Sequence, residues 1–98
     1  MTAPESALKK KFKDYIEYRG GFWSSIQAGP GSKIGDPDMI ACYKGVYVAI
    51  EGKTYEGSQS EWQKLRQKQI QAAGGIYLLA RTVEDIADTF DEIDKQKE

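Results

Sequence analysis

The amino-acid sequence predicts an α/β fold, in which a single mixed β-sheet is flanked by helices in the order α-β-β-β-α-β-α. Apolar residues recur at helical spacing in the first and last segments. Two central segments are instead apolar on both faces, as strands covered on both sides are. Glycine-containing turns separate most of these segments. The 98 residues suffice for one domain with one modest core, so we expect a single domain over residues 1–98.

The first helix is expected over residues 4–18, and Gly20-Gly21 ends it. A short strand over residues 22–27 and a polar loop over residues 28–35 follow. Phe22 and Trp23 in this strand are candidate interface residues. The apolar stripe of the helix consists of Leu8, Phe12, Tyr15 and Ile16.

Two strands are expected over residues 38–43 and 46–53, with Lys44-Gly45 as the turn between them. If this turn has two residues, Tyr43 pairs with Val46. Counting outward from that pair places Asp38 opposite Glu51. We expect Cys42 to be a small buried residue of the first of these strands.

A helix is expected over residues 60–73, ended by Gly74-Gly75. Its capping box is formed either by Ser58 with Glu61 or by Ser60 with Gln63. We expect Trp62 and Leu65 to be core or interface residues. A buried strand over residues 76–80 follows. Thr82 then caps a last helix, whose apolar stripe consists of Val83, Ile86, Phe90 and Ile93.

Composition excludes several classes of function. With 14 basic and 15 acidic residues the net charge is −1, so the chain is no histone-like binder. The absence of histidine excludes Ser-His-Asp and Cys-His catalysis and histidine-bound zinc. We expect no signal peptide, no membrane partner and no small-molecule cofactor. A single cysteine cannot form an internal disulfide, which favours an intracellular location.

Asp38 and Glu51 face each other in the predicted hairpin, and Lys53 shares their face of the sheet. Two opposed carboxylates repel unless a positive charge lies between them, and either a divalent metal or Lys53 can supply it. Oxygen ligands favour Mg²⁺ or Mn²⁺ over zinc. Such a site suits phosphodiester hydrolysis. The alternative is a surface ion triad without chemistry.

These residues resemble a known family. Residues 36–38 (DPD) with 50–53 (IEGK) resemble the PD-(D/E)XK nuclease superfamily. The longer series of residues 35–38 (GDPD), 48–53 (VAIEGK) and 73–77 (AGGIY), together with Gly57, Ser60 and Gln63, resembles the VRR-NUC nuclease domain in its small, stand-alone, phage-type form. The resemblance covers about residues 5–86 and implies a restriction-endonuclease-like core.

The resemblance also implies roles for individual residues. Asp38 and Glu51 would bind the metal, together with the main-chain carbonyl of Gly52, where the family usually has a bulky apolar residue. Lys53 would be the catalytic lysine. Gln63 would support that lysine or contact the phosphate.

Two acidic residues have open alternatives. Glu5 would be a further metal or water ligand, but it also fits a capping box with Thr2 in a first helical turn. Asp36 competes with Asp38 as the ligand. We favour Asp38, because Asp36 precedes a proline and lies outside the hairpin register.

Basic residues flank the predicted site. Clustered charge of this kind can follow a phosphate backbone, although lysines on a helix are also ordinary solvent-exposed residues. The candidate DNA-binding residues are Lys9 and Lys10 in the first helix, Ser32 and Lys33 in the loop, and Lys64 in the second helix.

No motif that reads bases is present, so recognition of DNA shape is expected. Small stand-alone members of the resembled family are dimers that cut four-way junctions, and two active sites would explain paired nicks. The sequence therefore predicts a Mg²⁺- or Mn²⁺-dependent DNA endonuclease, a homodimer like a Holliday junction resolvase. The alternatives are a flap or duplex nuclease of the same fold, a non-catalytic nucleic-acid-binding module and a small interaction protein.

Overall fold

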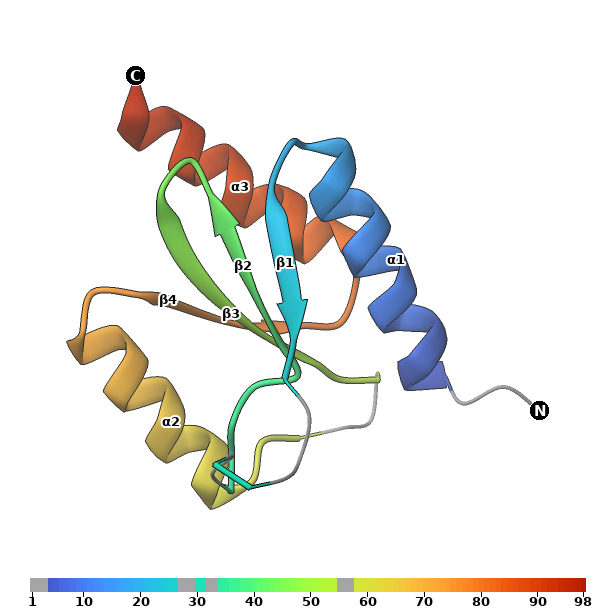
Figure 1. The fold of residues 1–98 in the computed structure, drawn as a ribbon, viewed down its shortest axis with the longest axis vertical. Helices are drawn as coiled ribbons and strands as arrows, with labels where there is room; N and C mark the ends of the chain where they lie inside the picture. The colour runs from blue at the N-terminus through green and yellow to red at the C-terminus, as the bar shows by residue number, and fades with distance from the viewer. Residues whose placement is uncertain (1–3, 27–29, 32–33, 55–57) are drawn as a thin grey trace.

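The computed structural model describes residues 4–26, 30–31, 34–54 and 58–98, without the side chains of Pro4 and Glu5. The observed order of elements is the predicted one (Figure 1). The helices are α1 (Pro4–Tyr18), α2 (Glu61–Ala72) and α3 (Val83–Lys97). The strands are β1 (Phe22–Ser25), β2 (Met39–Tyr43), β3 (Val46–Gly52) and β4 (Ile76–Ala80).

The four strands form one mixed sheet in the order β1-β2-β3-β4. β1 and β2 pair antiparallel, as do β2 and β3, whereas β3 and β4 are parallel. Tyr43 pairs with Val46, as predicted. The turn between them has a positive φ at both central residues, 50° at Lys44 and 82° at Gly45, which matches the twist of the flanking strands.

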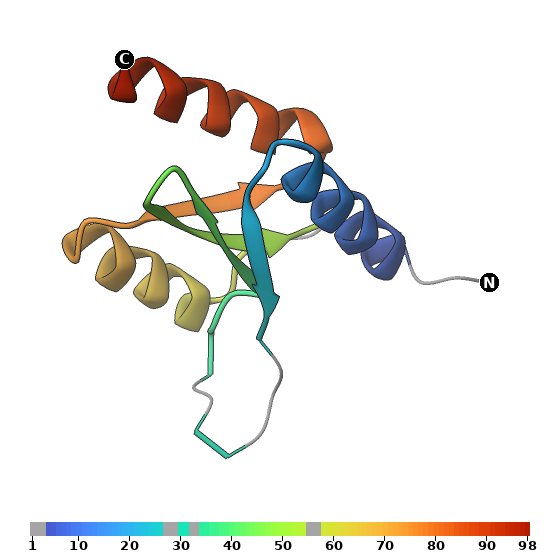
Figure 2. The ribbon, with the colours of Figure 1, turned by 45° about the horizontal axis from the view of Figure 1, so that its top comes forward.

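Two helices cover one face of the sheet and the third lies on the other (Figure 2). α1 and α3 pack on the first face, where they form the core with alternate strand residues. The helix residues of this core are Phe12 and Ile16 from α1 and Ile86, Phe90 and Ile93 from α3. None of the residues of α2 is buried. Most of the core therefore lies between the sheet and the pair α1–α3.

The thin cover on the α2 side corrects several sequence expectations. Cys42 is exposed and not buried. Trp62 and Leu65 were expected in the core or in an interface, and their exposed fractions of 52% and 41% exclude the core alone. The reason is that α2 contacts β4, so the part of this face formed by β1 and β2 has little cover. The expectation that β2 is covered on both sides is therefore wrong, although β3 is buried from Val48 to Gly52.

Caps define the beginnings of the last two helices. Ser60 and Gln63 form the capping box of α2, which decides between the two boxes that the sequence allowed. Thr82 caps α3, as predicted, and its partner in a second capping box is Asp85. In the described part of the chain, no helix has the length and apolar character needed to cross a membrane.

Gly35 fixes the beginning of α2 against the loop that precedes β2. Its φ is +88°, and a Cβ atom there would collide with the main-chain carbonyl of Trp62. We expect Gly35→Ala to lower the free energy of unfolding by about 2–4 kcal/mol, through overpacking and left-handed strain. Gly31→Ala is the control, since Gly31 has a φ of +91° but open space around it, and should cost only about 1–2 kcal/mol. Equal losses in urea denaturation would contradict this packing.

Candidate active site

The antiparallel pairing of β2 and β3 brings the beginning of one strand beside the end of the other. Asp38 directly precedes β2, and its Oδ2 accepts a hydrogen bond of 2.8 Å from the main-chain N–H of Gly52. The main-chain carbonyl of Asp38 accepts a second bond, 2.9 Å long, from the N–H of Ile26. The carboxylate of Asp38 is therefore held at the end of β3, next to Glu51.

Glu51 is the buried acid of this site, with an exposed fraction of 4%. Its Oε1 has no hydrogen-bond partner among the described residues. The pKa of Glu51 is raised from 4.5 to about 8, first by burial and then by the hydrogen bond and the negative charge of Asp38. The positive charges of Lys53 and Lys9 act in the opposite direction on this pKa. Burying a carboxyl group with an unpaired oxygen costs folding free energy. Such strongly perturbed buried acids are typical of functional sites.

Two lysines from different elements approach the two acids. Lys53 directly follows β3, and its main-chain N–H donates a hydrogen bond of 3.0 Å to the carbonyl of Ala80. Lys9 reaches the site from α1, with its Nζ 3.2 Å from Oδ1 of Asp38. From the sequence, Lys9 was predicted only as part of the DNA-binding flank, and this contact was missed. The available signal was spacing, because Lys9 lies three residues before Phe12 and seven before Ile16, both of which are buried.

Tyr77 is a second buried polar residue on the same face of the sheet. It pairs with Ala49 in the parallel register, so it lies on the side of Glu51. Its hydroxyl lies near Gln59 but has no hydrogen bond of normal geometry within the described part of the chain. Burial raises the pKa of Tyr77, and the charges of Glu51 and Asp38 act in the same direction. From the sequence, Tyr77 was predicted only to lie in a buried strand.

The arrangement of the whole chain resembles that of a solved structure described as a VRR_NUC domain. The two share a TM-score of 0.72 and 20% sequence identity, over 96% of this chain and 94% of that chain. The chain has the fold of a VRR_NUC domain. The sequence itself matches no family model and no curated protein. The likeness confirms the predicted restriction-endonuclease-like fold, with its mixed four-stranded sheet and three helices.

On this VRR_NUC fold, the acids fit a hard divalent cation in three respects. All the available side-chain donors are oxygens, two carboxyl groups meet, and one buried oxygen of Glu51 has no partner in the described structure. Among the described residues, no three acidic or cysteine side chains lie together in a way that could hold a metal ion. The side chain of Glu5, the third predicted carboxylate ligand, is not among those described, although Glu5 itself lies in the first turn of α1.

The structure locates the other predicted site residues of the VRR_NUC pattern. Gln63 uses its Oε1 to accept a hydrogen bond of 2.9 Å from the main-chain N–H of Ser60, within the capping box. Asp36, the alternative ligand, has its Oδ1 3.3 Å from Nε of Arg66 and thereby links the loop to α2. The main-chain N–H of Gly52 donates a hydrogen bond to Asp38, and the role of its carbonyl as a metal ligand stays a prediction.

The predicted DNA-binding residues fall into three groups. Lys9 lies in the site itself. Lys10 and Lys64 are exposed and form ion pairs within their own helices, with Asp14 and Glu61 respectively. Ser32 and Lys33 lie outside the described residues.

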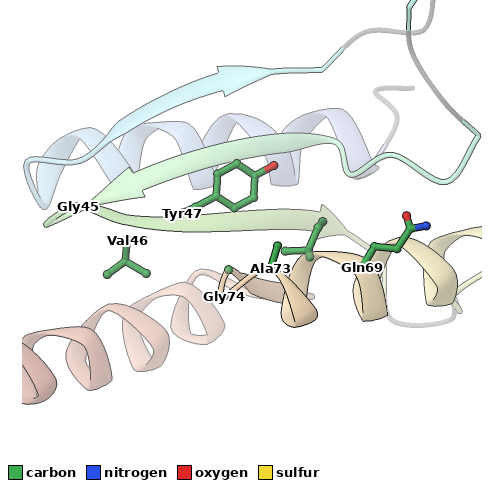
Figure 3. A pocket seen from close by; sticks show the side chains of 8 residues that line it. Gly45, Val46, Tyr47, Gln69, Ala73 and Gly74 are labelled. Atoms are coloured by element: carbon green, nitrogen blue, oxygen red, sulfur yellow. The ribbon is translucent and has the colours of Figure 1, made fainter.

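An open pocket of about 560 Å³ lies away from the two acids, between the beginning of β3 and the C-terminal half of α2. Figure 3 shows Tyr47 of β3 together with Gln69 of α2 and Ala73, the residue that caps α2, along this pocket. It adjoins the Val46 end of β3, whereas Glu51 lies near the other end of that strand. The pocket carries no carboxylate and does not belong to the candidate active site. Its lining residues are Gly45, Val46, Tyr47, Gln69, Ile70, Ala73, Gly74 and Gly75.

Proposed function

We propose that residues 1–98 form one nuclease domain, which hydrolyses phosphodiester bonds in DNA with Mg²⁺ or Mn²⁺. The observation that carries this proposal is the contact between Asp38 and the buried Glu51, at the end of a strand that continues into Lys53. A plain surface ion triad does not require a carboxyl group that is only 4% exposed and has a raised pKa. A VRR_NUC fold with this acid pair supports nuclease chemistry more strongly than the sequence pattern alone.

Each residue of the site would have a separate role in phosphodiester hydrolysis. Asp38, Glu51 and the main-chain carbonyl of Gly52 would hold the cation, with Glu5 as a further ligand. When bound, the cation would polarise the phosphate and lower the pKa of a water molecule. Lys53 would orient that water or balance the charge that develops on the phosphate. Gln63 would contact the phosphate or support Lys53 through the amide nitrogen that its capping box leaves available.

We further propose that the substrate is branched DNA, with a four-way junction cut by a homodimer. Exposed apolar side chains support an interface with a second copy: Phe22, Tyr47, Trp62 and Leu65 have exposed fractions from 41% to 67%. Phe22 belongs to the face of the sheet on which Cys42 is exposed, so the uncovered part of that face is a candidate contact. Two copies would place two active sites on one junction and would thereby produce paired nicks.

The test is strand cleavage of labelled four-way junction, flap, duplex and single-stranded DNA, side by side, with Mg²⁺ or Mn²⁺. We expect paired nicks on the junction, which disappear with EDTA or with Glu51→Gln. Glu61→Gln is the matched control, because Glu61 is an exposed glutamate of α2. Sedimentation velocity at micromolar concentration should show a dimer.

Each departure from this result removes a defined part of the proposal. Cleavage of flaps or duplex alone keeps the nuclease but removes the junction as substrate. A monomer at micromolar concentration removes the homodimer. Absence of cleavage on every substrate, with DNA binding retained, would indicate a non-catalytic nucleic-acid-binding module.

A further inference from the structure

Lys9 forms the one ion pair that any described residue makes with Asp38 in the structure. Its Nζ lies 3.2 Å from Oδ1 of Asp38, whereas Oδ2 of the same carboxylate accepts the hydrogen bond from Gly52. The pair is partly shielded from solvent, with side-chain exposed fractions of 34% for Lys9 and 21% for Asp38. Both oxygens of the proposed metal ligand are therefore engaged by groups of the protein itself.

The stem of Lys9 lies near the main chain of Gly52, which carries no side chain. A Cβ atom at Gly52 would lie 3.3 Å from Cε2 of Phe12, 3.5 Å from Oδ2 of Asp38 and 3.8 Å from Cγ of Lys9. The stem of Lys9 therefore passes directly over the main chain of Gly52, beside the buried ring of Phe12. A Cβ at position 52 would be in ordinary van der Waals contact with Lys9 and in tighter contact with the ring of Phe12. The contact joins α1 to the residue that precedes β2, and the same carboxylate is hydrogen-bonded to Gly52 of β3.

We propose that Lys9 is a positioning residue that holds Asp38 in the metal-free protein and is released from it when a divalent cation binds. This inference rests on the proposed function, because it takes Asp38 as a metal ligand. An ammonium group 3.2 Å from Oδ1 and a divalent cation bound to the same carboxylate would repel each other. Lys9 therefore competes with the cation for Asp38. Once released, its ammonium group remains beside the site, where it can bind a phosphate oxygen.

The decisive measurement is calorimetric titration of Mn²⁺ into the full chain without DNA. We expect Lys9→Gln to bind Mn²⁺ about three- to tenfold more tightly than the unmodified protein, since the cation no longer displaces an ion pair. Lys10→Gln removes the same charge from the adjacent residue, whose partner is Asp14, and should change the affinity by less than about twofold. An unchanged or weaker affinity of Lys9→Gln would overturn the inference.

The ammonium signals of the lysines in nitrogen-15 NMR report the release directly. The Lys9 signal should shift on titration with diamagnetic Mg²⁺, whereas the Lys10 signal should stay in place. In the metal-free protein, Asp38→Asn should shift the Lys9 signal in the absence of any cation. The role of Lys9 would be overturned if its signal did not shift with Mg²⁺ although the protein bound Mn²⁺ and cut DNA. The proposed function would then remain intact. Failure of the unmodified protein to bind either cation would overturn both.

Discussion

Replacing Lys53 with methionine should reduce DNA cleavage by about 10²–10⁴-fold, the range that a positioned acid–base or charge-stabilising group contributes. Methionine keeps much of the apolar stem but removes the ammonium group. Lys53 follows the last residue of β3, so its position is fixed by the strand and by the hydrogen bond of its N–H to Ala80. The substitution should leave DNA affinity within about threefold of that of the unmodified protein, because Lys53 would supply only one of several positive charges that contact the DNA backbone.

The measurements are single-turnover cleavage of a labelled four-way junction and binding of the same junction in Ca²⁺. Lys95→Met is the matched control, since Lys95 is an exposed lysine in the last turn of α3 and is not among the predicted DNA-binding residues. Cleavage by the Lys53 variant at more than a tenth of the normal rate would remove Lys53 from the mechanism. A parallel loss of binding and cleavage would instead assign it to DNA contact.

The metal-free protein should become less stable as the pH rises from about 4.5 to about 8. Glu51 has a pKa of about 8 in the folded chain and about 4.5 when unfolded, so between these values the folded state binds one more proton. The stabilisation is complete below the lower value and is lost as the pH rises through the upper one. At about 1.36 kcal/mol for each pH unit, and with relaxation of the site, we expect a loss of roughly 2–4 kcal/mol.

Urea denaturation at several pH values in EDTA measures this loss. Glu51→Gln should flatten the pH dependence, because glutamine keeps the shape of the protonated acid and cannot ionise. Glu61→Gln, which alters an exposed acid, should leave the curve of the unmodified protein unchanged. A stability that rises between pH 5 and 8 would show that Glu51 is ionised in the folded chain.

The hairpin was the part of the site that the sequence predicted best. The two-residue turn at Lys44-Gly45 sets the register, and alternation then carries that register to Asp38 and Glu51 by simple counting. The capping box at Ser60 and the buried stripes of α1 and α3 were equally local signals. Features that depend on short-range chemistry along the chain can therefore be predicted from the amino-acid sequence alone.

Features that depend on how distant elements pack cannot be predicted in the same way. The exposure of Cys42 follows from where α2 lies over the sheet, which no local pattern encodes. The contact of Lys9 with Asp38 joins α1 to the residue that precedes β2, across 29 positions of sequence. The burial of Glu51, which raises its pKa, likewise depends on how several helices and strands pack together.

The single thiol of this chain has a practical use. Because Cys42 is exposed and the sequence contains no other cysteine, a maleimide or nitroxide reagent would attach one probe per polypeptide without prior mutagenesis. Any distance between two such probes, measured by pulsed electron resonance in solution, would necessarily join separate molecules. The spacing obtained would locate the β2 surfaces of the two polypeptides relative to each other, with and without a DNA junction.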